Sequence, residues 1–272
     1  MNTIIAHGDL DGIISAALLL KAKRLNDYNV IFTEPFLLDK IKVPENDNIF
    51  IVDIAINNKN PNMTLNFINT YKTQISKWYD HHQGWKNYKL SESFIIDETK
   101  QSCASIIGGD PELVEAATIA DTRQGELLEK FKILEDAIKS NPQDDSTRHQ
   151  VLAFLLGDES MFPLLKQKAE KYAEVKQTTE EVAKNYVVSG NVAYVDATFK
   201  EVDITALLLA GEKLAKFAVV KHNQNGEVVY TVATLSKVNL LEIFGLKSGA
   251  KFRVTLPSST DLEELLKKLN AV

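Results

Sequence analysis

The chain has 272 residues, of which 44% are hydrophobic and 25% are charged. These values are those of an ordinary globular protein and exclude a disordered, collagen-like or disulfide-dense chain. The net charge of −6 gives no overall positive field for long duplex DNA, although it leaves room for a local basic patch.

No run of apolar residues reaches the roughly 18–20 residues that cross a bilayer, and the first residues lack the pattern of a signal peptide. The single cysteine, Cys103, cannot form an internal disulfide, which fits a reducing compartment. We therefore expect a cytoplasmic protein with no membrane partner.

The first hundred residues alternate between strand and helix patterns. Apolar, β-branched runs predict strands over 2–6, 29–36, 48–56 and 74–79, and apolar residues at helical spacing predict helices over 10–23 and 63–73. This alternation predicts an α/β fold with a doubly wound, mainly parallel sheet.

From residue 101 the pattern becomes helical, with helices expected over 101–107, 111–120, 126–139, 146–156 and 161–186. Alternation then returns, with strands over 191–196, 216–222 and 228–235, a hairpin turn at 223–226, and helices over 204–215 and 261–269. We predict a larger domain over 1–157, a connecting helix over 158–189 and a smaller α/β domain over 190–272.

Acidic residues and histidines gather at the C-terminal ends of predicted strands or at adjacent helix starts, where open α/β sheets bind ligands. They form four groups along the sequence: His7-Gly8-Asp9-Leu10-Asp11-Gly12, Asp53, Asp80-His81-His82 and Asp121.

A charged Asp53 inside an apolar strand would cost several kcal/mol unless it is paired or bound to a metal. Bringing it close to Asp9, Asp11 and Asp121 would force like charges together, whereas two divalent ions roughly 3.5–4 Å apart would hold all four carboxylates and activate water. Mixed Asp and His ligands fit Mn²⁺, or less specifically Mg²⁺, Co²⁺ or Zn²⁺. The alternatives are a buried salt bridge at Asp53 and helix-capping aspartates in the first turn.

These motifs, in this order, resemble the DHH phosphoesterase superfamily. That superfamily includes RecJ-like exonucleases, short-oligonucleotide ribonucleases, cyclic-dinucleotide phosphodiesterases, pyrophosphatases and exopolyphosphatases. The resemblance covers roughly the first 150 residues and is specific because four separate motifs agree. It makes 1–157 the catalytic domain and 190–272 the substrate-binding domain.

The resemblance also implies roles for single residues. One ion would take His7, Asp9 and Asp53, and the other would take Asp11, Asp53, His81 and Asp121, so that Asp53 bridges the two. His82 would touch the substrate phosphate, and Asp80 would orient a neighbouring histidine. Trp85, which follows the third motif, is a candidate for stacking on a base.

The C-terminal domain departs from the family. The usual Gly-Gly-Gly-His stretch corresponds here to residues 247–254, where Gly249 remains and Ala250 takes the histidine position. Lys247, Lys251 and Arg253 could still bind an anion. Arg123 stands where the family often has Gly, within reach of a phosphate.

We expect a two-ion, Mn²⁺-dependent phosphodiesterase or exonuclease that hydrolyses short oligonucleotides, single-stranded nucleic acid or small nucleotides. Hydrolysis of polyphosphate or pyrophosphate is an alternative, and so is a catalytically silent scaffold in a nucleic-acid-processing complex. Whether the chain forms a homodimer is left open by the sequence.

Overall fold

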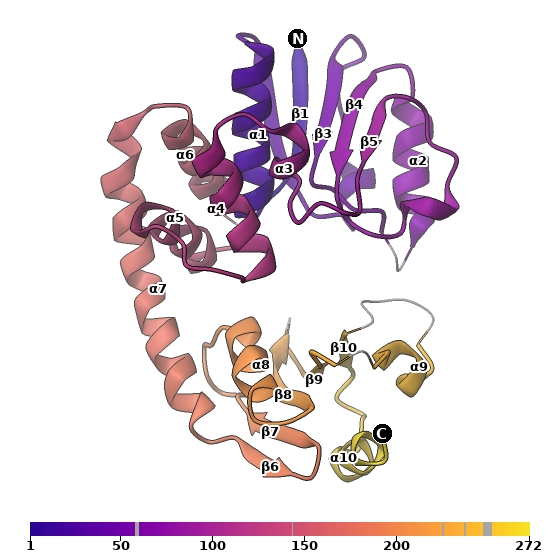
Figure 1. The fold of residues 1–272 in the computed structure, drawn as a ribbon, viewed down its shortest axis with the longest axis vertical. Coiled ribbons are helices and arrows are strands. Elements are labelled where there is room, and N and C mark those ends of the chain that lie inside the picture. The colour runs from indigo at the N-terminus through magenta and orange to yellow at the C-terminus, as the bar shows by residue number, and fades with distance from the viewer. Residues whose placement is uncertain (58–59, 143, 225, 237, 247–251) are drawn as a thin grey trace. The chain divides into compact units, whose positions relative to one another are not determined.

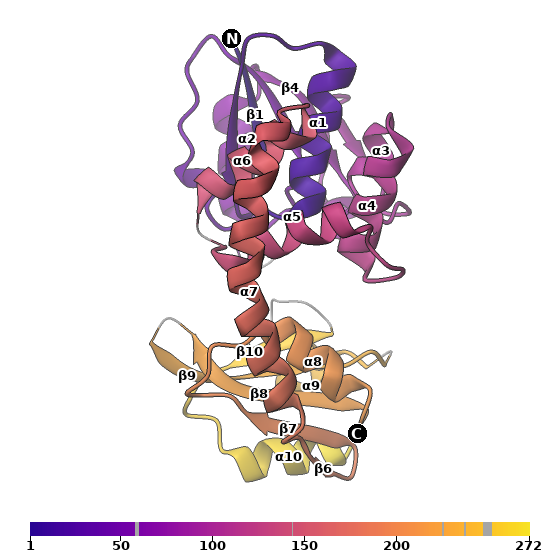
Figure 2. The same cartoon turned by 90° about the vertical axis from the view of Figure 1, so that its left-hand side faces the viewer.

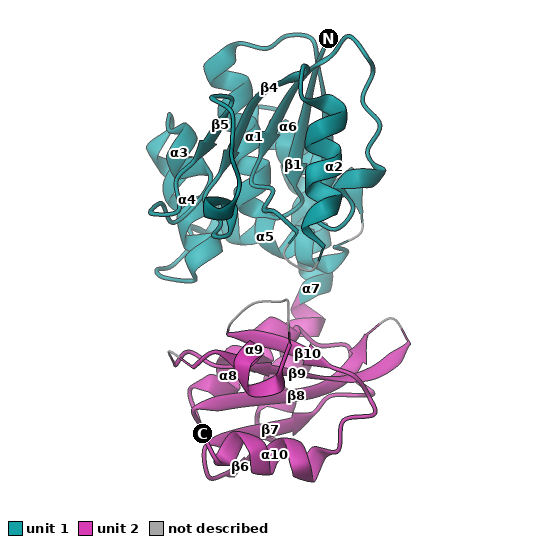
Figure 3. Ribbon diagram, turned by 90° about the vertical axis from the view of Figure 1, so that its right-hand side faces the viewer, with its two compact units in different colours: residues 1–172 teal, residues 173–272 magenta. Residues whose placement is uncertain are grey.

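A computed structural model describes residues 1–272 except 58–59, 143, 225, 237 and 247–251. The chain divides into two compact units, residues 1–172 and 173–272 (Figure 3). The division falls within α7 (Phe162–Ala183), which overlaps the predicted connecting helix.

Unit 1 is built on a five-stranded sheet in which every neighbouring pair of strands is parallel. The spatial order is β2-β1-β3-β4-β5. The strands are β1 (Asn2–His7), β2 (Tyr28–Thr33), β3 (Asn48–Val52), β4 (Ile75–Asp80) and β5 (Phe94–Ile96). Because β1 lies between β2 and β3, the order of the strands reverses there, and this reversal opens a crevice at the carboxyl edge.

Helices cover both faces of this sheet, which confirms the predicted doubly wound fold (Figure 1). Ile4 and Ala6 enter the core on one face and Ile5 enters the core on the other, as strand alternation requires. The first face carries α1 (Leu10–Lys23), α3 (Ala104–Ile107), α4 (Pro111–Thr122), α5 (Glu129–Ser140) and α6 (Asp145–Leu155), and the second carries α2 (Pro61–Tyr71).

Helix α1 is the central helix of the first face. Residues Leu10 to Leu20 are all buried, and α1 and α6 lie side by side over the sheet (Figure 2). A helix that is apolar on all sides is stable only where neighbours cover it on all sides. The loop that leads from β1 into α1 is therefore fixed at both of its ends.

Several predicted boundaries were wrong, and one error matters for the site. Strand β3 ends at Val52 and not at Ile56, because Asp53 adopts a left-handed backbone conformation with φ of 59° that no strand accommodates. Strand β2 likewise ends at Thr33, and the short β5 was not predicted at all. Strand β5 has three residues, all partly buried, and this is too short a stretch to show the alternation that identifies a strand.

Unit 2 has a mixed sheet in the order β10-β9-β8-β7-β6, in which only β7 and β8 pair in parallel. The predicted hairpin is confirmed by the antiparallel pairing of β8 with β9. The strands are β6 (Val187–Ser189), β7 (Val192–Asp196), β8 (Phe217–Gln224), β9 (Glu227–Ala233) and β10 (Arg253–Leu256), and the helices are α8 (Ile204–Glu212), α9 (Leu240–Phe244) and α10 (Leu262–Asn270).

A search of the described residues finds no helix that is both long enough and apolar enough to span a membrane.

We predict that Asp144 stabilises unit 1 only while it is ionised. Its carboxylate caps α6 and accepts hydrogen bonds from Thr147 Oγ1 (2.6 Å) and Lys168 Nζ (2.9 Å). These bonds hold the pKa of Asp144 at about 2, below its ordinary value of 3.8. The stabilisation is therefore present above pH 4 and is lost as the pH falls from about 4 to about 2.

The variant Asp144→Asn keeps a capping side chain but loses the charge. We expect it to lower the free energy of unfolding at pH 7 by on the order of 1 kcal/mol or less, because the contact with Lys168 is partly exposed. Urea unfolding at a series of pH values should show the deficit vanish near pH 2. A deficit that does not change with pH, or an equal one in the control Asp158→Asn, would contradict this prediction.

Candidate metal centre

The carboxyl edge of the unit 1 sheet brings three of the four sequence motifs together. Strand β1 ends at His7, Asp53 follows the last residue of β3, and β4 ends at Asp80. These strands are neighbours in the sheet, so side chains that are far apart in sequence meet at the point where the strand order reverses. Asp121 reaches the same place from the last turn of α4.

A first group of possible metal ligands consists of His7, Asp9 and Asp53, whose candidate ligand atoms all lie within 4.8 Å of one another. His7 Nδ1 lies 2.9 Å from Asp9 Oδ2 and 3.7 Å from Asp53 Oδ2. This is the set that the family resemblance gives to one ion.

A second group consists of Asp53, His81 and His82. His81 Nε2 lies 3.4 Å from Asp53 Oδ1, 3.7 Å from Asp121 Oδ2 and 3.8 Å from Asp11 Oδ2. Of the four residues that the resemblance gives to the other ion, three are thus carboxylates that surround the imidazole nitrogen of the fourth, His81. Asp53 belongs to both groups. Its Oδ2 faces His7 in the first group, and its Oδ1 faces His81 in the second.

Asp53 is the residue that the surrounding structure holds most firmly. Its side chain is buried, its φ is positive, and its backbone N–H donates to Tyr79 O at 2.9 Å. A non-glycine residue in the left-handed region costs of order 1–3 kcal/mol, with aspartate among the types that tolerate it best, and such strain gathers at functional sites.

A divalent cation would fit this donor set. Asp53 Oδ1 and His81 Nε2 are both buried, and within the part of the chain that the structure describes neither has a hydrogen-bond partner. Buried polar atoms are nearly always satisfied, and an orphaned carboxylate oxygen is among the most costly exceptions. An ion between these two atoms would satisfy both of them.

Asp11 caps a helix other than its own and also lies 3.8 Å from His81 Nε2. Its carboxylate accepts the N–H groups of Cys103 (2.7 Å) and Ala104 (3.0 Å) and the hydroxyl of Ser15 (3.2 Å), and it therefore caps α3. Asp9 likewise caps α1 through Gly12 N at 3.0 Å. A carboxylate has about four acceptor positions, so neither cap prevents binding of an ion.

The carboxylate of Asp80 holds the ring of His82 in place. Its two oxygens contact His82 Nδ1 (2.8 Å) and Trp85 Nε1 (2.6 Å). Burial opposes protonation of His82, but the bond to Asp80 outweighs it and raises the pKa of His82 to about 9. The expectation that Trp85 stacks on a base was wrong, because its ring is buried and its N–H is engaged by Asp80.

The carboxylates of the site repel one another. Burial and the nearby charges of Asp53 and Asp9 raise the pKa of Asp11 well above its usual range, and burial together with Asp53 also raises the pKa of Asp121. Burial alone would raise the pKa of Asp9, but the charge of His7 and its hydrogen bond hold that pKa below the usual range. Bound cations would relieve this repulsion.

Two residues at the site escaped the sequence reasoning. Glu34 Oε2 lies 3.1 Å from His7 Nε2, and Arg148 of α6 donates from Nε to Gly8 O at 3.1 Å. A signal existed for Glu34, because it directly follows a strand of the parallel sheet. Arg148 gave none, since its position in a helix does not indicate which loop it contacts.

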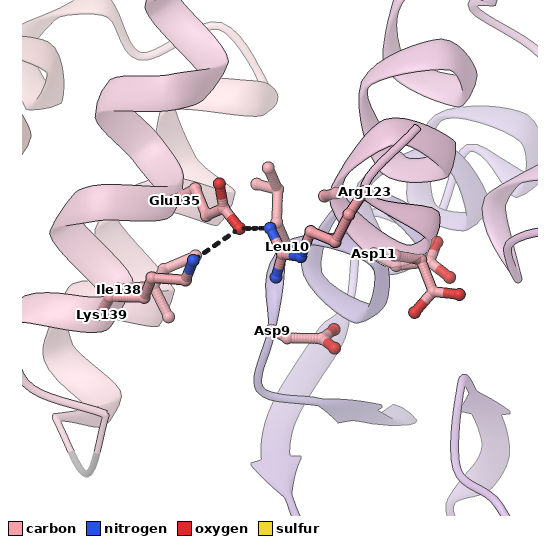
Figure 4. Close-up of a pocket in the computed structure, with 9 residues that line it drawn as sticks. Asp9, Leu10, Asp11, Arg123, Glu135, Ile138 and Lys139 are labelled. Atoms are coloured by element: carbon pink, nitrogen blue, oxygen red, sulfur yellow. Dashed lines mark hydrogen bonds and ion pairs between the residues drawn. The ribbon is translucent and has the colours of Figure 1, made fainter. Parts of the chain in front are cut away.

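A pocket next to the ligands contains the candidate substrate residue Arg123. Figure 4 shows Arg123 and Lys139 both pointing at Glu135, with Asp9 and Asp11 nearby. Lys139 Nζ lies 3.0 Å from Glu135 Oε1, and Arg123 Nη1 pairs with the same oxygen. One carboxylate is thus shared by two cations.

The predicted substrate residues of the C-terminal domain are only partly described. Lys247, Gly249 and Lys251 lie outside the described residues. Arg253 opens β10, and its Nη1 donates to Thr205 Oγ1 at 3.2 Å. The anion-binding role of this segment stays a prediction.

Solved structures resemble this chain in fold, whereas the comparisons of sequence find no match. No family model and no curated protein matches the chain. Among solved structures, the pGpG-specific phosphodiesterase PggH from Vibrio cholerae has a TM-score of 0.72 and 17% identity, over 100% of this chain and 98% of that one.

An exonuclease RecJ bound to manganese has a TM-score of 0.66 and 12% identity, over 99% of this chain and 89% of that one. The chain shares the fold of these two proteins. The fold class expected from the sequence is thereby confirmed. An exopolyphosphatase-related protein from Bacteroides fragilis has a similar fold, with a TM-score of 0.53 and 12% identity, over 99% of this chain and 90% of that one.

We predict that Asp53→Asn abolishes metal binding at both groups of possible ligands. Asparagine tolerates the left-handed backbone and keeps the size of the side chain, so the fold should survive. Since losing an outer partner of a ligand already costs 10–100-fold in affinity, we expect the Kd for Mn²⁺ to rise by more than about 100-fold. Isothermal titration calorimetry would measure it.

The matched control is Asp27→Asn, which changes an exposed aspartate before β2. It should bind Mn²⁺ as the unmodified protein does. If Asp53→Asn kept one full-affinity site, Asp53 would not be shared by two ions.

Proposed function

We propose that the chain is a phosphodiesterase that uses two divalent ions to hydrolyse short oligonucleotides, with linear dinucleotides of the pGpG type as the first candidates. The observation that carries this proposal is the position of Asp53, which faces His7 with one oxygen and His81 with the other, while Asp9 lies beside His7 and Asp11 and Asp121 lie beside His81. Two neighbouring ions in such a site can stabilise both the attacking and the leaving oxygen of an in-line displacement at phosphorus.

We assign one ion to His7, Asp9 and Asp53, and the other to Asp11, Asp53, His81 and Asp121. Mixed oxygen and nitrogen ligands favour Mn²⁺, with Mg²⁺ or Co²⁺ as substitutes. When bound, the two ions would lower the pKa of a water molecule and neutralise charge on the phosphate.

The remaining catalytic role falls to His82. Because its Nδ1 contacts Asp80, its Nε2 is left to donate a hydrogen bond to a phosphate oxygen. With a pKa of about 9, His82 carries this proton at neutral pH. The bond from Trp85 to Asp80 keeps the carboxylate in place.

Two features favour a short nucleotide substrate over long DNA. The chain is acidic overall, whereas tracking a long backbone usually needs a basic groove. The fold match to the pGpG-specific phosphodiesterase spans nearly all of both chains. We assign phosphate contacts to Arg123 in unit 1, and to Lys247, Gly249, Lys251 and Arg253 in unit 2.

We predict that the protein with Mn²⁺ converts pGpG and a 5′-labelled RNA pentamer to mononucleotides. The activity should disappear with EDTA and in Asp53→Asn, and persist in Asp27→Asn. Chromatography of the products would measure it, with cyclic di-GMP, pyrophosphate and polyphosphate as parallel substrates.

Each alternative has its own outcome in this experiment. Release of phosphate from pyrophosphate or polyphosphate alone would replace the proposal by phosphoanhydride hydrolysis. Bound Mn²⁺ with no turnover of any substrate, or a site that stays empty at saturating Mn²⁺, would favour the scaffold.

We predict that removing the charge of Arg123 and removing the charge of Glu135 change KM in opposite directions. Arg123→Met removes a charge-assisted bond to the substrate phosphate, worth roughly 1.5–3 kcal/mol, so KM should rise at least tenfold. Glu135→Gln frees Arg123 and Lys139 from their shared partner, so KM should fall. Steady-state kinetics on pGpG would measure both.

Lys132→Met, on the exposed side of α5, is the control for loss of a positive charge. It should leave KM unchanged. Equal changes in KM for Lys132→Met and Arg123→Met would mean that only long-range charge matters here.

A further inference from the structure

Glu34 lies between a candidate ligand and a buried cation. Its Oε2 is 3.1 Å from His7 Nε2, and its Oε1 is 3.8 Å from Arg148 Nη2. It belongs to neither group of possible metal ligands. Resting on the metal centre of the proposed function, we propose that Glu34 and Arg148 are positioning residues that hold the His7 ring with its proton on Nε2 and with Nδ1 toward the ion.

The chemistry of imidazole carries the first step. Carboxylates face both ring nitrogens of His7, with Asp9 at Nδ1 and Glu34 at Nε2. Asp9 is itself a candidate ligand of the ion and Glu34 is not, so with the ion bound Glu34 is the carboxylate left to accept a proton from Nε2. The nitrogen that binds a metal must be free of a proton, and this leaves Nδ1 for that role. Nδ1 is also the atom that lies 2.9 Å from Asp9 Oδ2 and 3.7 Å from Asp53 Oδ2.

The contacts of Arg148 carry the second step. Its guanidinium donates to Gly8 O (3.1 Å), Asp145 Oδ1 (2.7 Å) and Pro142 O (2.7 Å). Every guanidinium nitrogen is thus engaged, and the side chain is buried. Arg148 therefore acts on the protein's own loop and is not available to a substrate phosphate.

Gly8 shows how closely this loop and Arg148 fit together. It stands between His7 and Asp9, and a Cβ at this position would overlap the guanidinium of Arg148. One charged side chain from α6 therefore fixes the loop that presents two candidate ligands, and it also lies beside the carboxylate that orients one of them. Outer partners of this kind usually change metal affinity by 10–100-fold.

The test measures the ring and the ion without any substrate. Long-range ¹H–¹⁵N NMR of histidine-labelled protein saturated with diamagnetic Mg²⁺ reports which His7 nitrogen carries the proton. Calorimetry reports the Kd for Mn²⁺. The unmodified protein should show a protonated Nε2, and Glu34→Leu should lose this preference and bind Mn²⁺ 10–100-fold more weakly.

Glu34→Gln is the conservative variant, because its amide oxygen can still accept the Nε2 proton. It should recover most of the affinity and the Nε2–H signal, a rescue that a purely structural ion pair with Arg148 would not give. Arg148→Lys should weaken Mn²⁺ binding by a smaller factor, since a lysine cannot make all three backbone and side-chain contacts. Glu45→Leu, at an exposed glutamate of the same unit, is the control.

Three results would overturn the proposal. They are a proton on Nδ1 in the Mg²⁺-bound protein, an unchanged Mn²⁺ Kd in Glu34→Leu, and a Glu34→Gln variant as weak as Glu34→Leu. Failure to hydrolyse pGpG would affect only the proposed function, because no readout here uses turnover. An unmodified protein that binds no Mn²⁺ would overturn both. If Glu34→Leu does not fold, Glu34→Asp takes its place as the weakened variant beside Glu34→Gln, because its shorter side chain draws the carboxylate away from His7 Nε2.

Discussion

The mutual repulsion of buried carboxylates around Asp53 is the constraint on which the rest of unit 1 depends. Asp53 is buried, two oxygen- and nitrogen-bearing groups converge on it, and one of its oxygens lacks a hydrogen-bond partner among the described residues. Such an arrangement loses free energy unless positive charge is supplied. Two divalent ions at this site would supply that charge and could activate a water molecule.

The repulsion between these carboxylates is tolerated because the structure around them is firmly packed. Helix α1 is buried over most of its length, and the loops at the carboxyl edge are held by caps from Asp9 and Asp11 and by the guanidinium of Arg148. Each capping carboxylate serves the backbone and faces the site at once. The packing of this loop also explains why Gly8 and Gly12 are glycines, since a Cβ would overlap Arg148 at the first position and the backbone of His7 at the second.

Electrostatics also separates the roles of the neighbouring histidines. His81 faces the carboxylates of the site with a nitrogen that has no hydrogen-bond partner among the described residues, whereas His82 contacts Asp80 and keeps its proton at neutral pH. His81 is thus suited to bind an ion, and His82 is suited to donate to a phosphate. The two adjacent histidines differ because the Asp80 carboxylate contacts the ring of His82.

The sequence by itself determined the parallel sheet and the identity of the acidic and histidine residues at its edge, because strand periodicity and the position after a strand are local properties. Only the tertiary structure decided that β3 ends at Val52, before the left-handed Asp53, and that Trp85 donates a hydrogen bond to Asp80. It also decided that Glu34 and Arg148 contact the loop of His7 and Asp9. Such contacts join residues that lie far apart in the sequence, and Gly8 and Arg148 are separated by 140 positions. Local patterns carry no information about such distant partners, since packing alone chooses them.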